Sequence, residues 1–168
     1  MPNRIRSLTM DDVASIVALT SAQADRHVVY KAVEAVTAET CGFLFLTTLK
    51  YNEAEQVVER LHSSHEETYP VGGRKPLSKI TASHQAMDSG EVFLAGTREA
   101  VKEAFFDHEL IFSLGSTAIM NAPIRHAGRR LGTLNLCGEE GMYGPAEVRT
   151  AQILAGLLIP SLLQEVGP

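Results

Sequence analysis

A hairpin pattern in the second half of the chain constrains the fold more than any other feature. Two runs rich in apolar residues, 117–125 and 129–137, are separated only by residues 126–128. Gly128 suits the positive φ that a tight hairpin turn requires. Gly132 interrupts the second run, which is typical of a bend or of a close approach by another backbone. We therefore predict two long antiparallel strands whose alternate residues face opposite sides of a sheet.

Hydrophobic periodicity predicts helices and strands in the rest of the chain. Thr9 and Asp12 have the spacing of a capping box and predict a helix start. A continuous apolar run predicts a central strand over 43–49, covered on both faces. Pro145 predicts the start of a closing amphipathic helix, which Pro160 should kink or end. The other expected elements are helices over 24–40, 76–90 and 97–106, strands over 56–63 and 91–95, a polar loop over 64–76 and a short helical turn over 107–114.

Length and composition describe one ordinary globular domain. The chain has 168 residues, of which 45% are hydrophobic and 21% charged, and its net charge is -5. Such a charge does not favour binding to nucleic acid or to an anionic membrane. Two cysteines give no disulfide framework and indicate a reducing compartment. The N-terminus has no signal-peptide pattern, and no segment has the ~18 uncharged apolar residues of a membrane span. We therefore expect a cytoplasmic protein that interacts with neither nucleic acid nor membrane.

The order of these elements and the hairpin motif together resemble the GAF domain family. The motif comprises Leu114-Gly115, residues 121–124 (NAPI), Gly128 and residues 131–136 (LGTLNL). The resemblance implies an α+β fold with an antiparallel sheet of five or six strands, helices on both of its faces, and terminal helices packed together. It covers most of the chain, with residues 1–8 as an N-terminal arm and residues 9–166 as a single GAF-like domain.

The resemblance also implies a ligand pocket between the sheet and the segments 69–74 and 105–116. His108 and Arg74 would supply polar contacts there, and Phe93, Phe105 and Ile111 would supply apolar walls. The full set of expected ligand-binding residues is Tyr69, Arg74, Phe93, Phe105, His108, Ile111, Ser113, Ser116, Asn121 and Asn135.

Two ligand classes of the family require signatures that this chain lacks. Members that bind cyclic nucleotides carry an Asn-Lys pair, whereas Asn121 is followed by Ala122. Members that attach bilins use a cysteine next to a histidine, whereas His108 lies between Asp107 and Glu109.

Several polar residues allow both a functional and a structural interpretation. The segment Asp107-His108-Glu109 could hold a general base or a ligand-polarising histidine, or it could simply begin a helix beside a half-exposed histidine. Arg74 could pair with a ligand carboxylate or lie in a mobile loop. His62, His65 and His84 do not have the spacing of a known metal motif, so we expect no metal site and no cofactor.

The number and the positions of the cysteines favour a sensor over a thiol enzyme. The free methionine sulfoxide reductases are small GAF enzymes that use several cysteines near the pocket, whereas Cys41 and Cys137 occupy strand-like positions. We therefore expect a non-catalytic module that senses or regulates by binding a small molecule. The chain contains no output domain, so the signal would pass to a separate partner, and a homodimer through the terminal helices is expected. The alternatives are an enzyme, either a redox enzyme of the reductase type or a small hydrolase using His108, and a dimerisation scaffold without a ligand.

Overall fold

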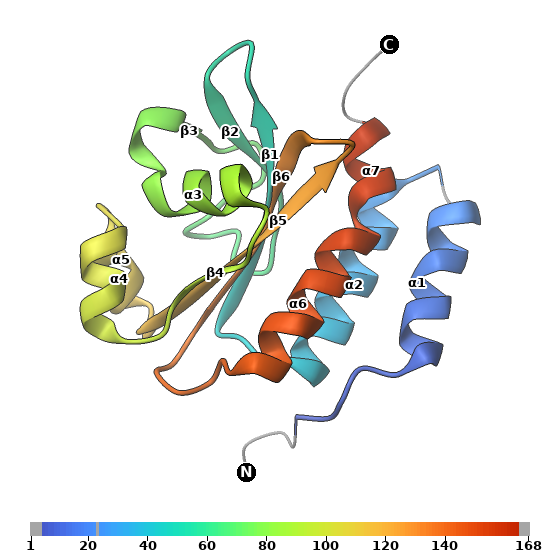
Figure 1. Cartoon of the computed structure of the whole chain (residues 1–168), viewed down its shortest axis with the longest axis horizontal. Helices are drawn as coiled ribbons and strands as arrows, with labels where there is room; N and C mark the ends of the chain where they lie inside the picture. Colours follow the sequence, from blue (N-terminus) through green and yellow to red (C-terminus); the bar gives the residue numbers. More distant parts are fainter. Residues whose placement is uncertain (1–4, 23, 165–168) are drawn as a thin grey trace.

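A six-stranded antiparallel sheet forms the centre of the molecule (Figure 1). The computed structural model describes residues 5–22 and 24–164. The strand order is β3-β2-β1-β6-β5-β4, and every neighbouring pair is antiparallel. The strands are β1 (Phe45–Asn52), β2 (Val57–Ser63), β3 (Arg74–Pro76), β4 (Phe93–Ala95), β5 (Ala118–His126) and β6 (Arg129–Gly138). This confirms the α+β fold with an antiparallel sheet.

Helices cover both faces of the sheet, as expected. One face carries α1 (Met10–Ala22), α2 (Arg26–Thr40), α6 (Pro145–Leu157) and α7 (Ile159–Gln164). The other face carries the 3-10 helix η1 (Leu77–Lys79), α3 (Thr81–Ser89), α4 (Arg98–Ala104) and α5 (His108–Ser113). Figure 1 shows α6 and α2 side by side against the sheet, with α1 outside them. The first and last helices therefore lie in the same layer.

The hairpin predicted from the sequence is β5 and β6. Ala127 and Gly128 both have positive φ, as the tightest two-residue turns require. Gly132 marks a close approach between backbones, because a Cβ atom there would lie 1.9 Å from the carbonyl oxygen of Leu49 on β1. The glycine thus allows β1 and β6 to pair at the centre of the sheet.

Strand alternation divides the apolar side chains into separate clusters on the two faces. Leu46, Met120 and Leu136 face α2 and α6, within the largest cluster of buried residues. Their neighbours Phe45, Ile119 and Cys137 face α4 and α5. Because successive side chains of a strand point to opposite faces, one sheet supplies both the main core and the wall of the site described below.

Three elements differ from the sequence-based expectation beyond small shifts of their ends. The central strand is displaced to Phe45–Asn52, and the loop 64–76 contains the short edge strand β3. The helix expected over 76–90 becomes the 3-10 helix Leu77–Lys79 followed by α3 from Thr81. The closing helix stops at Leu157 and α7 follows, in agreement with the break expected at Pro160.

The chain start is tied to the helical layer. The backbone N–H of Thr9 donates to Asp12 and the backbone N–H of Asp12 donates to the Thr9 hydroxyl, so the predicted capping box is present. Arg6 forms ion pairs with Asp12 and Glu39. Of the predicted arm, residues 1–4 lie outside the described residues, and so do residues 165 and 166 of the predicted domain.

One helical run, Pro145–Gln164, is long and apolar enough to cross a membrane by length and composition, with a mean hydropathy of 1.3. Leu154, Leu158 and Leu162 of this run are buried in the main core. The run also divides into α6 and α7. We therefore interpret it as a core helix pair of this domain.

Candidate functional site

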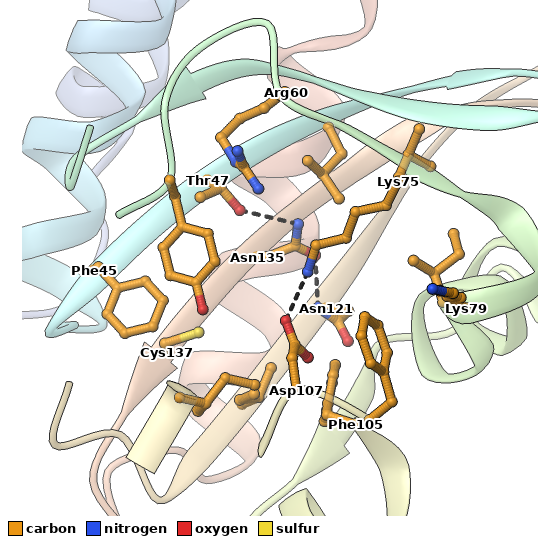
Figure 2. A pocket seen from close by; sticks show the side chains of 18 residues that line it. Phe45, Thr47, Arg60, Lys75, Lys79, Phe105, Asp107, Asn121, Asn135 and Cys137 are labelled. Carbon is orange, nitrogen blue, oxygen red and sulfur yellow. Dashed lines mark hydrogen bonds and ion pairs between the residues drawn. The ribbon is translucent and has the colours of Figure 1, made fainter. Parts of the chain in front are cut away.

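A cavity lies between the sheet and the segment that contains Phe105 and α5 (Figure 2). About 690 Å³ of space free of protein atoms lies within its walls and at its mouth, part of it open solvent. Strands β1, β2, β5 and β6 form its floor, and the loop before β3 together with residues 105–111 form its sides.

Aromatic and aliphatic side chains form most of the wall. Phe45 and Tyr69 stack with ring centroids 5.2 Å apart and planes inclined by 22°. Phe105, Ile111 and Ile119 complete the apolar surface. Burial raises the pKa of Tyr69 above its ordinary value, so its hydroxyl is neutral at physiological pH.

A row of hydrogen-bonded polar side chains crosses the floor. Asn121 lies opposite Asn135 in the register of β5 and β6, and Asn135 lies opposite Thr47 on β1. The Asn121 amide donates to Asn135 Oδ1 at 2.6 Å, and the Asn135 amide donates to Thr47 Oγ1 at 3.2 Å. Asn121 is only 2% exposed, and its Oδ1 has no hydrogen-bond partner. The row therefore ends in a buried acceptor on the cavity floor.

Charged groups lie along the sides. Lys75 Nζ lies 2.7 Å from Asp107 Oδ2, an ion pair that joins β3 to the start of α5 (Figure 2). Arg60 is 7% exposed, and its guanidinium carbon lies 5.0 Å from the ring centroid of Tyr69. Lys79 extends from η1 over the ring of Phe106. Burial lowers the pKa of Arg60, as expected for a cation removed from water.

The structure brings half of the expected ligand-binding residues together. Tyr69, Phe105, Ile111, Asn121 and Asn135 all line the cavity. They come from the loop before β3, from residues 105–111 and from the hairpin, so the expected location between these segments agrees with the geometry.

The other five expected residues do not line the cavity, for identifiable reasons. Arg74 is exposed at the sheet edge and forms ion pairs with Glu55 and Glu59. Phe93 packs edge-on against Phe105 from outside the cavity.

His108 and the two serines are likewise directed elsewhere. His108 Nδ1 donates to the carbonyl oxygen of Phe105, and the ring borders a separate surface depression. The Ser113 hydroxyl donates to the carbonyl oxygen of Leu110 within α5. Ser116 is fully buried and donates to the carbonyl oxygens of Ala118 and Gly138.

The main polar residues that the sequence prediction missed are Thr47, Arg60 and Lys75, whereas Asp107 lines the cavity and belongs to the Asp107-His108-Glu109 segment considered above. The sequence does contain a signal for Arg60. Arg60 lies two residues after Val58 on β2, so both side chains point to the same buried face, where a charged residue is unusual. Lys75 gives no signal, because the sequence around it has the pattern of a polar loop and not of a strand.

Cys137 also lines the cavity, whereas Cys41 belongs to the cluster on the opposite face of the sheet. Both thiols are free and buried, as expected. Burial raises the pKa of Cys41 to about 11 and that of Cys137 to about 12. A raised pKa disfavours the thiolate, which is the nucleophilic form of cysteine.

The histidines considered as metal ligands do not converge. His62 Nε2 lies 2.5 Å from Glu34 Oε2, and His84 contacts the hydroxyl of Tyr51. Within residues 5–22 and 24–164 there is no group of three or more His, Cys, Asp or Glu side chains arranged to hold a metal ion.

A family model described as GAF domain matches residues 7–159 of this chain. No curated protein matches the sequence. Among solved structures, the chain is similar to the GAF domain of an Acinetobacter phosphoenolpyruvate-protein phosphotransferase, with a TM-score of 0.74, 14% identity, and coverage of 94% of each chain.

Two further structures have comparable similarity. The free methionine-R-sulfoxide reductase of Neisseria meningitidis, solved with its substrate, has a TM-score of 0.68 and 14% identity, and covers 98% of this chain and 99% of its own. The A. aeolicus nlh2 GAF domain has a TM-score of 0.69 and 15% identity, with coverage of 94% and 96%. At these identities the similarity establishes the fold alone.

Proposed function

Because this chain belongs to the GAF domain family, we propose that it is a regulatory module that binds a small molecule in the cavity of Figure 2. The observation that carries the proposal is the construction of the cavity. Its apolar wall surrounds a few fixed polar groups, including the Asn121–Asn135–Thr47 row on three adjacent strands. This combination is typical of small-molecule sites. The buried Asn121 Oδ1 has no hydrogen-bond partner, and a ligand donor would offset the cost of burying it.

The module acts without catalysis in this proposal. The similarity to a methionine sulfoxide reductase, together with Cys137 on the cavity wall, makes thiol redox chemistry the alternative to test. Two features of the chain argue against it. Both thiols have raised pKa values, and the sheet separates Cys137 from Cys41. Thiol exchange requires a thiolate and access of one sulfur to the other.

The proposal includes a homodimer through the terminal helices and a separate output protein. Met10 and Val17 on α1 and Ile153 on α6 are 79%, 47% and 48% exposed, so apolar side chains remain uncovered in this layer. A second copy packed there would cover them. Light scattering of Val17→Glu should then give the monomer mass, and a dimer mass would contradict this interface. Val71→Glu is the matched control, because Val71 is 44% exposed in the loop before β3.

Native mass spectrometry in the presence of a metabolite extract tests ligand binding. The wild-type chain should acquire a reproducible added mass that is lost on denaturation. Ile111→Trp, which places an indole in the cavity, should lose the added mass. Leu110→Trp, which adds an indole on the exposed side of the same helix, should keep it, because Leu110 is 43% exposed and does not line the cavity. A clean apo mass for the wild type would favour the scaffold without a ligand, and an added mass on Ile111→Trp would place the binding elsewhere.

A further inference from the structure

Arg60 is a buried cation without a carboxylate partner. Its Nη1 donates to the carbonyl oxygen of Pro70 at 2.9 Å, and its Nε is buried without any partner. In the described part of the chain, no carboxylate lies within 4.0 Å of this guanidinium. Asp107 is near enough to act on Arg60 through its charge but already pairs with Lys75. Burial of a charge is costly unless the charge is paired, so this side chain lacks a counterion.

The ionisable groups around the cavity leave an excess of positive charge. The lining includes the cations Arg60, Lys75 and Lys79 and one anion, Asp107. This excess occurs in a chain whose net charge is -5, so it is local to the cavity. A field of this sign inside low-dielectric walls favours an anionic ligand.

The free edge of the guanidinium indicates which anion fits. Among the residues that the structure describes, only Nη1 makes a hydrogen bond to the protein, which leaves Nε and Nη2 side by side without acceptors. Two parallel N–H groups match the two oxygens of a carboxylate. Figure 2 shows the guanidinium directed into the cavity, above Asn135. The guanidinium carbon lies 5.0 Å from the ring centroid of Tyr69.

The opposite end of the site needs a hydrogen-bond donor. The amides of Asn121 and Asn135 are engaged in the polar row, and the buried Asn121 Oδ1 has no donor. A ligand N–H or O–H group would satisfy it. Between these two ends, the stacked Phe45 and Tyr69 rings and the ring of Phe105 offer contact to an apolar body.

We propose that the cavity selects a small organic carboxylate whose acid group pairs with Arg60, whose apolar body contacts the aromatic wall, and whose N–H or O–H group donates to Asn121. This inference rests on the proposed function, because it names the ligand class of the same site.

Isothermal titration with matched acids and neutral amides tests the inference. The probes are acetate and acetamide, benzoate and benzamide, and 4-hydroxybenzoate and 4-hydroxybenzamide, with inorganic phosphate as a different anion. The wild type should bind 4-hydroxybenzoate at least roughly tenfold more tightly than its amide, because a hydrogen bond to a charged group is among the stronger ones. Affinity should rise from acetate through benzoate to 4-hydroxybenzoate as the apolar body and the donor are added.

Arg60→Gln should abolish the preference for the acid while retaining the weak binding of the amide. Arg74→Gln removes an arginine of β3, the strand paired with β2, whose side chain lies off the cavity wall, and it should leave the preference unchanged. Arg60→Lys, which keeps the charge but not the paired N–H groups, should retain a reduced preference. Circular dichroism verifies that each variant is folded, and the wild-type comparison of acid with amide does not depend on any variant.

Equal binding of acid and amide would overturn the inference and leave the proposed small-molecule function standing. Tighter binding of phosphate than of 4-hydroxybenzoate would overturn the assignment to carboxylates. Absence of binding by every acid at millimolar concentration would overturn the inference as well. The added mass in native mass spectrometry decides the proposed function separately.

Discussion

Replacing Gly132 by alanine should strongly destabilise the domain, because the new methyl group meets a backbone rather than a movable side chain. The added Cβ would lie 1.9 Å from the carbonyl oxygen of Leu49 and 2.8 Å from Cδ2 of Leu162. An ordinary carbon–oxygen contact is about 3.3 Å, so β1 and β6 would have to part by roughly 1.4 Å. Gly132 pairs with Lys50 at the centre of the sheet, where neither strand is free to move.

The size of the effect follows from these contacts. Parting the strands breaks about two backbone hydrogen bonds at roughly 1 kcal/mol each. Overpacking a filled core adds about 1–3 kcal/mol. The expected loss of about 3–5 kcal/mol is a large fraction of the ~5–15 kcal/mol by which domains are stable.

Urea denaturation followed by circular dichroism measures this loss. Gly156→Ala is the matched control, since a Cβ there meets no atom within 4 Å and the residue lies in α6. It should stabilise the domain by about 0.4–1 kcal/mol. A loss below about 1 kcal/mol for Gly132→Ala would refute the argument that this glycine permits the close strand approach.

Three other features give measurable expectations. Burial lowers the folded-state pKa of His62 against the opposing effect of a neighbouring carboxylate, so the unfolded chain binds more protons. The contribution of His62 to the free energy of unfolding is complete above about pH 6.5 and is lost as the pH falls through the lower folded-state pKa. His62→Gln should therefore flatten the pH dependence of the urea midpoint in this range. An unchanged slope would exclude His62 as the source of the pH dependence. Cys41 and Cys137 should react with Ellman's reagent at pH 8 at least roughly a hundredfold more slowly than free cysteine, with urea-unfolded protein as the control, and near-equal rates would disprove their burial. Leu154→Ala should cost about 2–5 kcal/mol in thermal or urea unfolding, whereas Ile153→Ala, which is 48% exposed before substitution, should cost under about 1 kcal/mol; similar losses would contradict the assigned orientation of α6.

The sequence predicts those parts of the fold that depend on local patterns. The alternation in residues 117–137 and the glycine of the turn specify the hairpin, and the Thr9–Asp12 spacing specifies a helix start. The edge strand β3 escaped prediction, because its three residues, Arg74–Pro76, have neither β-branched side chains nor alternation. Its pairing with β2 is decided by the tertiary structure.

The alternation of side chains along the strands and the resemblance to the family predict which segments surround the site. Asn121 and Asn135 lie on the hairpin, so their shared face follows from the register. Arg74 and Lys75 are adjacent and similar in charge, yet only Lys75 lines the cavity. The direction of β3 decides which of the two points inward, and a sequence without that strand assignment cannot separate them.

The central claim is that the cavity on the α4–α5 face of the sheet is the ligand site. Methyl NMR of isoleucine-labelled protein, titrated with a fractionated metabolite extract, tests it most directly. Ile111 and Ile119 line the cavity, whereas Ile16 and Ile124 are buried in the core on the other face. We predict that one fraction shifts the signals of Ile111 and Ile119 and leaves those of Ile16 and Ile124 in place. Shifts confined to Ile16 and Ile124, or no shift with any fraction, would contradict the account.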